Sequence, residues 1–192
     1  MEMQHVNVKL LVTRPEEVDL EPVVPVFHTW IQGQIFDGQL LDVADYRHVP
    51  AGPGVVLIGL EGDFSVDNAD NRLGVRYNRK AVLHGDNQNR LRQAARAALT
   101  ACQRLQDEAN LGGQLNFNGR DIEIFINDRL LAPNRDETRE ALKSDFQTFS
   151  DQLYGKGKYT LSYGNDPRRL FTVYLKASEP RPVADLLANL PS

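Results

Sequence analysis

The chain opens with a strict alternation of apolar and polar residues, which is the period of a half-buried β-strand. The apolar positions are Val6, Val8, Leu10 and Val12. The polar residues between them, Asn7 and Lys9 among them, are expected to point away from the core. Arg14-Pro15 ends this predicted strand.

Three longer segments repeat their apolar residues at the period of an α-helix. The first runs from Val23 to Ile31, and the second spans roughly residues 87–109, where Gly112-Gly113 stops it. The third carries the stripe Leu142, Phe146, Phe149 and Leu153. Residues 182–190 predict a short terminal helix.

The remaining segments predict strands that pair as hairpins. Residues 40–49 favour a strand with mixed faces, and alternation from Val56 onward is the strongest strand signal in the chain. A four-residue loop at 68–71 would place Asp67 opposite Arg72 and Asp63 opposite Arg76. Two further hairpins are expected, one joining 115–117 to 121–129 and one joining 159–163 to 170–177.

This order of elements predicts one α+β domain over residues 1–192. We expect a mainly antiparallel sheet, built from three hairpins plus N-terminal strands, with about three helices packed on one face. No linker rich in Pro, Ser or charge divides the chain.

Composition excludes some classes of function but does not identify a specific one. The 22 Lys+Arg and 26 Asp+Glu residues give a formal charge of −4, so no basic field favours nucleic acid as a partner. The single cysteine, Cys102, lies in an apolar stripe and is expected to be buried and structural. Without a basic leader or a long apolar segment, the sequence predicts a cytoplasmic protein that makes no use of a membrane.

One candidate catalytic group lies near the end of the predicted strand at 40–49. His48 could act as a general base oriented by Asp42 or Asp45, with Arg47 beside it, as in a small hydrolase or a ligand-binding enzyme. On an extended strand, however, Asp42 and His48 lie about 20 Å apart and Asp45 points to the opposite face. A polar strand end leading into a Pro/Gly turn is the favoured interpretation.

A second candidate site is the charged hairpin that follows. Its members are Glu61, Asp63, Asp67, Arg72, Arg76 and Lys80, with Arg47 as an additional candidate for binding. Cross-strand ion pairs on a solvated face explain these charges, and the alternative is a recognition surface for a protein partner or a small anionic ligand. The loop does not match a calcium-binding EF-hand, because Arg72 stands where glycine is required. The four histidines also lack metal-binding spacing, so neither a metal nor a cofactor is expected.

Three runs of residues resemble a family of uncharacterised bacterial proteins of about this length. They are Pro25-Val-Phe-His-Thr-Trp-Ile-Gln32, Asp42-Val-Ala-Asp-Tyr46 and the run from His48 to Asp63. The resemblance implies a complete, stand-alone bacterial protein. It implies no activity, cofactor or catalytic residue.

The sequence therefore favours a non-enzymatic binding or accessory protein. Its hairpins offer strand edges and a long polar face, through which it is expected to self-associate or bind a protein partner. The hydrolase that uses His48 with Asp42 or Asp45 remains the alternative.

Overall fold

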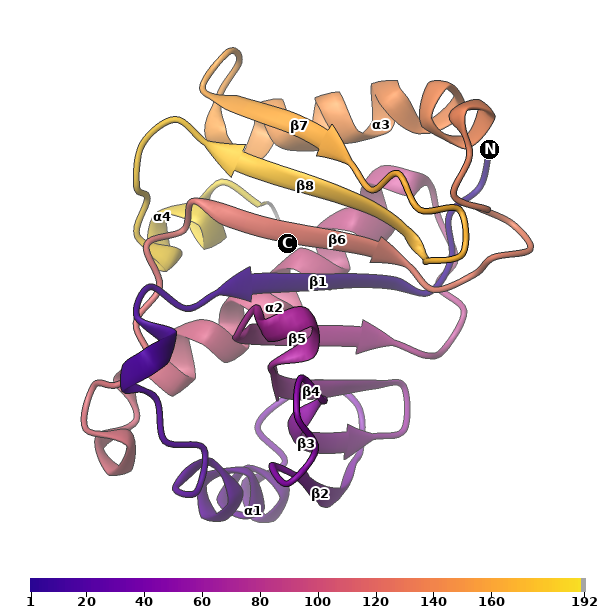
Figure 1. The fold of residues 1–192 in the computed structure, drawn as a ribbon. Helices are drawn as coiled ribbons and strands as arrows, with labels where there is room; N and C mark the ends of the chain where they lie inside the picture. The colour runs from indigo at the N-terminus through magenta and orange to yellow at the C-terminus, as the bar shows by residue number, and fades with distance from the viewer. Residues whose placement is uncertain (191–192) are drawn as a thin grey trace.

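The computed structural model describes residues 1–190 and contains one eight-stranded sheet (Figure 1). The strand order is β2-β3-β4-β5-β1-β6-β8-β7, and all neighbouring strands are antiparallel. The strands are β1 (Val6–Leu11), β2 (Leu40–Tyr46), β3 (Gly54–Gly59), β4 (Gly62–Asp67), β5 (Gly74–Arg79), β6 (Asp121–Ile126), β7 (Tyr159–Tyr163) and β8 (Phe171–Ala177). The helices are α1 (Val23–Gly33), α2 (Asn87–Asp107), α3 (Asp136–Tyr154) and α4 (Val183–Ala188). The expected α+β class with an antiparallel sheet is confirmed.

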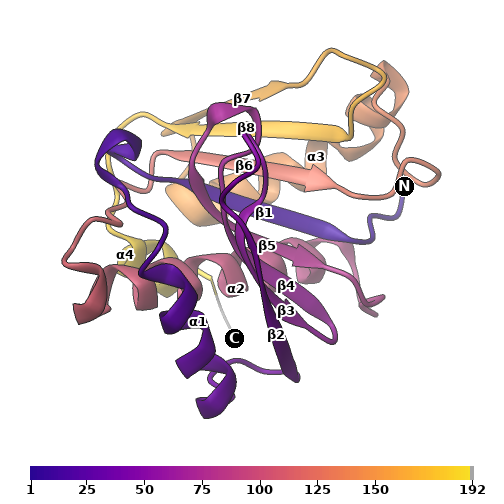
Figure 2. The ribbon, with the colours of Figure 1, turned by 60° about the horizontal axis from the view of Figure 1, so that its bottom comes forward.

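The helices cover one face of the sheet. The longest, α2, packs on the central strands β1 and β5, while α1 covers β2 and β3 and α3 lies against β7. Within residues 1–190 the opposite face carries no helix of comparable length, and the turns at the twisted β2–β4 end of the sheet extend over that face (Figure 2). That helix-free face is where the charged residues gather.

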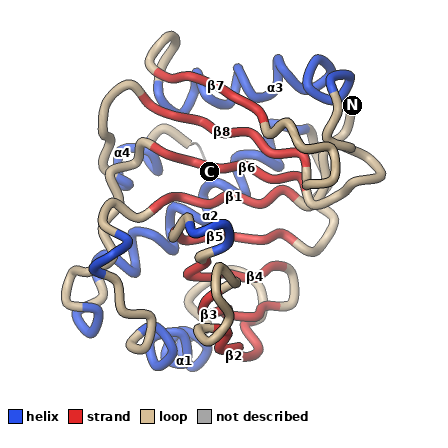
Figure 3. The backbone as a smooth tube through the Cα atoms, viewed as in Figure 1, coloured by secondary structure: helices blue, strands red, loops and turns tan. Residues whose placement is uncertain are grey.

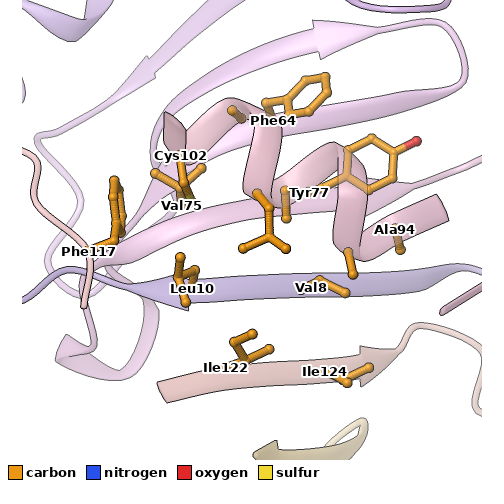
Figure 4. Packing of buried hydrophobic residues seen from close by; sticks show 14 of the residues in the cluster. Val8, Leu10, Phe64, Val75, Tyr77, Ala94, Cys102, Phe117, Ile122 and Ile124 are labelled. Carbon is orange, nitrogen blue, oxygen red and sulfur yellow. The ribbon is translucent and has the colours of Figure 1, made fainter. Parts of the chain in front are cut away.

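The core lies between α2 and the apolar face of the central strands. Val8 and Leu10 of β1 point toward the helix, as do Val75 and Tyr77 of β5 (Figure 4). Cys102 on α2 is fully buried, and that burial raises the pKa of its thiol well above the ordinary value. The sequence-based interpretation of this cysteine agrees with the structure.

The first predicted hairpin forms, but in a different register. The structure pairs Asp67 with Gly74 and Asp63 with Asn78, so the predicted pairs Asp67–Arg72 and Asp63–Arg76 are wrong. The alternation of apolar and polar residues repeats every two residues, so it cannot distinguish registers that differ by two. The loop is longer than predicted, because residues 69–71 form a 3₁₀ turn in which Asp70 and Asn71 adopt positive φ.

Two other strand predictions also need correction. The alternation after Val56 is divided between β3 and β4, which pair with each other across a turn at residues 60–61. The segment 115–117 is not a strand: after a short 3₁₀ helix at Ala109–Leu111, the chain up to β6 is drawn as loop in Figure 3. Instead of forming a local hairpin, β6 pairs with β1 and β8. The third hairpin, β7 with β8, is confirmed.

Candidate functional site

The central strand β1 buries polar side chains on the helix-free face. Asn7 is 0% exposed and Lys9 is 1% exposed, although both alternate with core residues and point away from α2. A fully buried lysine is rare in proteins unless its charge is paired. The charge of Lys9 must therefore be neutralised by other side chains on the helix-free face.

Strand pairing aligns Lys9 with charged residues on both sides. Arg76 on β5 and Glu123 on β6 are its direct cross-strand neighbours. The row continues to Ser65 on β4 and to Tyr174 on β8. A band of polar side chains thus crosses five adjacent strands from distant parts of the chain.

Lys9 is neutralised by Asp67 at the end of β4. Its Nζ lies 2.5 Å from Asp67 Oδ1, and both side chains are almost completely buried. Lys9 reaches this carboxylate past Gly74, where a Cβ would lie 2.5 Å from the Leu10 carbonyl oxygen and 3.1 Å from Lys9 Cε. Glycine at position 74 therefore leaves the space that the lysine occupies.

Arg76 lies beside this pair. Its Nη1 is 3.7 Å from Asp67 Oδ2, and its guanidinium carbon is 4.8 Å from the centroid of the Phe125 ring. The ring and the carboxylate together hold the guanidinium plane against the sheet. Arg76 Nε is buried and has no hydrogen-bond partner within residues 1–190.

Glu123 is the second buried carboxylate of the cluster. Its side chain is paired with the guanidinium of Arg72, which is itself about half exposed. Arg72 also lies over the ring of Tyr174, with 5.9 Å between its guanidinium carbon and the ring centroid. The carboxylates nearest Lys9 and Arg76 thus have cationic partners, as burial of charge requires.

A cleft of about 240 Å³ opens above this cluster. Its charged lining comprises five cationic and three acidic residues, a formal excess of two positive charges in a protein of net charge −4. The cationic residues are Lys9, Arg76, Arg129, Arg168 and Arg169, and the acidic residues are Asp67, Asp70 and Glu123. Low-dielectric walls strengthen such a local field, so the cleft favours an anion.

Two loops form the mouth of the cleft. Arg169, in the loop between β7 and β8, forms an ion pair with Asp70 in the turn between β4 and β5. In the same loop, Arg168 donates from Nε and Nη2 to the Asp166 carboxylate, each at 3.0 Å. These hydrogen bonds, with one from the Arg168 main chain, lower the pKa of Asp166 to about 2. The two ion pairs hold the exposed side chains of Arg168 and Arg169 at the mouth of the cleft.

Three of the predicted binding residues meet at this site. Asp67 and Arg76 line the cleft, and Arg72 supports Glu123 from the side. The other predicted residues lie elsewhere: Lys80 Nζ is 2.7 Å from Asp63 Oδ1 in a separate pair. Glu61 pairs with Arg79 and borders a second cleft, next to α2.

The residues near His48 are not arranged as a catalytic dyad. Arg47 binds the Asp45 carboxylate, with 2.8 Å from Nη2 to Oδ2, and this side-chain hydrogen bonding lowers the pKa of Asp45 to about 2. Asp42 Oδ1 accepts from the Val43 main-chain N–H at 2.8 Å. His48 is exposed, and within residues 1–190 no hydrogen bond joins it to either carboxylate.

Sequence reasoning missed the residues at the centre of the site. Lys9 and Asn7 follow the alternation of an ordinary solvent-facing strand side, and Glu123 becomes a neighbour of Lys9 only through the pairing of β6 with β1. A lysine between apolar residues on the first predicted strand was the one available signal. In the part of the chain that the structure describes, no three His, Cys, Asp or Glu side chains form a metal-binding group.

Comparison with known proteins adds no family to this description: no model of a known protein family and no curated protein matches the chain. Within residues 1–190, no helix has the length and apolarity needed to cross a bilayer.

Proposed function

We propose that this protein is a binding protein whose ligand is a small anion carrying phosphate or carboxylate groups, held in the cleft above Lys9 and Arg76. The observation that carries the proposal concerns the Nε–H donor of Arg76. This buried donor has no partner within the described residues, although the rest of the guanidinium is held in place by Asp67 and Phe125. An unsatisfied buried donor is costly, and an anionic oxygen would satisfy it.

The surrounding charges suit this ligand class. Arginine guanidinium groups match the planar geometry of carboxylate and phosphate oxygens, and four arginines line the cleft. The acidic residues Asp67 and Glu123 are already paired with Lys9 and Arg72, so they oppose an incoming anion less than free carboxylates would. Arg168 is paired with Asp166 and Arg169 with Asp70, so the excess positive charge of the cleft lies with Arg76 and Arg129.

A binding experiment with simple probes tests the proposal. Isothermal titration calorimetry with inorganic phosphate, pyrophosphate and citrate should detect saturable binding of at least one probe, weakened at least tenfold in Arg76→Gln. Arg14→Gln, which removes the same charge from a residue outside the cleft, is the matched control and should bind as the wild type does. Absence of binding to all three probes, or equal weakening by both variants, would contradict the proposal.

Association with another protein chain is a separate proposal. It depends on the edges of the sheet and not on the cleft, because neither edge strand contributes a residue to the cleft lining.

A further inference from the structure

The second cleft lies on the helix side of the sheet, next to α2, and has a volume of about 320 Å³. Sites for small molecules in proteins span about 300–1,000 Å³, so this cleft has room for a compact ligand. Its lining comes from the loop between α1 and β2, from the β3–β4 turn, from strands β4 and β5, and from one face of α2. It shares no lining residue with the cleft above Lys9 and Arg76, so it is a separate candidate site.

A row of aromatic rings forms the apolar part of this lining. Phe36 stacks on Phe64 with 4.2 Å between ring centroids, and Phe64 is 5.0 Å from the ring of its cross-strand neighbour Tyr77. Figure 4 shows Phe64 and Tyr77 on the side of the sheet that α2 covers. The loop that carries Phe36 is closed by Gln34, whose side-chain amide bonds both the N–H and the C=O of the Leu40 main chain. The rings are therefore held in place without a ligand.

The charges of the second cleft cancel. Its acidic residues are Asp37 and Glu61, and its basic residues are Arg79 and Arg96, so the formal sum is zero. Arg79 Nη1 donates to Glu61 Oε2 at 2.8 Å, and Arg96 Nη1 donates to the Leu190 carbonyl oxygen. Unlike the cleft above Lys9 and Arg76, this one has no excess charge to attract an ion. Its electrostatics favour a neutral ligand.

Two polar groups in the lining have unused hydrogen-bonding capacity. Gln93 Nε2 donates to Tyr77 Oη at 3.2 Å, whereas Gln93 Oε1 is buried and has no partner within residues 1–190. In the same part of the chain the Tyr77 hydroxyl accepts this bond and donates none. Gly62 leaves the space that the hydroxyl occupies, because a Cβ there would lie 2.7 Å from Tyr77 Oη. A free acceptor and a free donor thus lie side by side.

We propose that the second cleft binds a small neutral ligand whose planar heterocyclic ring carries an N–H next to a C=O, as uracil does. The ring packs against the aromatic side chains, and its edge bonds the two polar groups. The ligand N–H donates to Gln93 Oε1, and the ligand C=O accepts from the Tyr77 hydroxyl. The terminal torsion of a glutamine side chain has a broad energy minimum, so a small rotation of the Gln93 amide brings Oε1 to the ligand. Binding then satisfies a buried acceptor that is costly to leave without a partner.

A comparison of two ligands tests this proposal without any change to the protein. Proton–nitrogen NMR spectra show the side-chain amide of Gln93, which is assigned by loss of its signals in Gln93→Met. We expect a saturable shift of these signals during titration with uracil. Uracil methylated at both ring nitrogens keeps the ring and the carbonyl groups but has no N–H, so it should bind at least tenfold more weakly. Absence of a saturable shift with uracil, or equal binding of the two compounds, would overturn the proposal.

Matched variants test the two protein groups. Gln93→Met removes the amide with little change in length and should weaken uracil binding at least tenfold. Gln103→Met is the control, because Gln103 lies on the same helix outside the cleft and bonds Asp107. Tyr77→Phe keeps the ring and removes the hydroxyl, so it should also weaken binding. Far-UV circular dichroism checks that each variant is folded, and a folded Gln93→Met that binds uracil as tightly as Gln103→Met does would contradict the assignment.

The two clefts can be tested separately. Arg76→Gln should bind uracil as the wild type does, and Gln93→Met should bind pyrophosphate as the wild type does, because neither residue lines the other cleft. Loss of uracil binding in Arg76→Gln would show that uracil occupies the anion site, which would overturn the second site and leave the first. Failure of the anion site and failure of the heterocycle site are therefore distinguishable.

Discussion

Lys9 and Asp67 form an ion pair inside the protein, with 2.5 Å between Nζ and Oδ1 and nearly no exposure of either side chain. The pair joins β1 to the end of β4 across Gly74, so it links the central strand to the turn that forms one wall of the cleft. Because both side chains are nearly excluded from water, Lys9 depends on Asp67 for neutralisation, and Asp67 depends on Lys9 and, at 3.7 Å, on Arg76.

Removal of either partner alone should destabilise the protein, and the two losses should not add in the double variant. Lys9→Met and Asp67→Leu are each expected to cost about 3–5 kcal/mol, because the remaining charge is buried without its partner. The double variant should cost less than the sum of the two single variants, by about 1–3 kcal/mol. Urea unfolding of the four proteins measures these differences, and additive losses would show that the two side chains are not coupled.

Gly74 should be hard to replace. A Cβ there would approach the Leu10 carbonyl oxygen to 2.5 Å, so Gly74→Ala is expected to lose about 1–3 kcal/mol in the free energy of unfolding. Gly164→Ala is the matched control, because its Cβ would meet no atom closer than 3.5 Å and its φ is not in the left-handed region. Equal stability of both variants in thermal unfolding would argue against the close approach.

Prediction from sequence succeeded where local periodicity decides the outcome and failed where distant strands meet. The helical stripes located α1, α2 and α3, and the regular alternation in Tyr159–Tyr163 located β7. Period-two alternation gave the correct faces of the β4–β5 hairpin but not its register, because a shift of two residues leaves every side chain on the same face.

The candidate site shows the same limit. Asp67 and Arg76 were identified as charged residues of one hairpin, yet their actual contacts involve Lys9 and Phe125 from other strands. Glu123 had no local signal, since its neighbour Lys9 lies more than a hundred residues earlier in the chain. Polar residues on one side of a strand predict exposure only when nothing covers that side, and the turns and arginines that cover Lys9 come from distant segments.

Asp70→Asn should strengthen anion binding. The substitution removes a negative charge from the cleft lining and frees Arg169 from its ion pair. Because the pair is exposed, the stability change is expected to stay below about 1 kcal/mol. Calorimetric titration with pyrophosphate should give a lower dissociation constant than the wild type; an unchanged or higher constant would mean that Arg169 does not reach the ligand.

The loop at the mouth should keep its charge pair in acid. Arg168 lowers the pKa of Asp166 from 3.8 to about 2, so the folded loop holds this carboxylate ionised below the pH at which a free aspartate is protonated. The stabilising contribution is present above the ordinary pKa and is lost as pH falls through the folded value. In carbon-13 NMR the carboxyl group should titrate with a midpoint near 2 in the wild type and at a higher pH in Arg168→Gln, which loses the side-chain hydrogen bonds and keeps the main-chain one. Equal midpoints in the two proteins would exclude the pairing in solution.

The most direct test of the anion cleft observes Arg76 Nε itself. Proton–nitrogen NMR spectra of the arginine Nε–H groups, assigned by loss of one signal in Arg76→Gln, can be recorded during titration with pyrophosphate. The account predicts a saturable downfield shift of the Arg76 Hε signal, because the unpartnered donor gains an anionic oxygen. An Arg76 signal that stays in place while the protein binds pyrophosphate, or that shifts no more than the signal of Arg14, would contradict it.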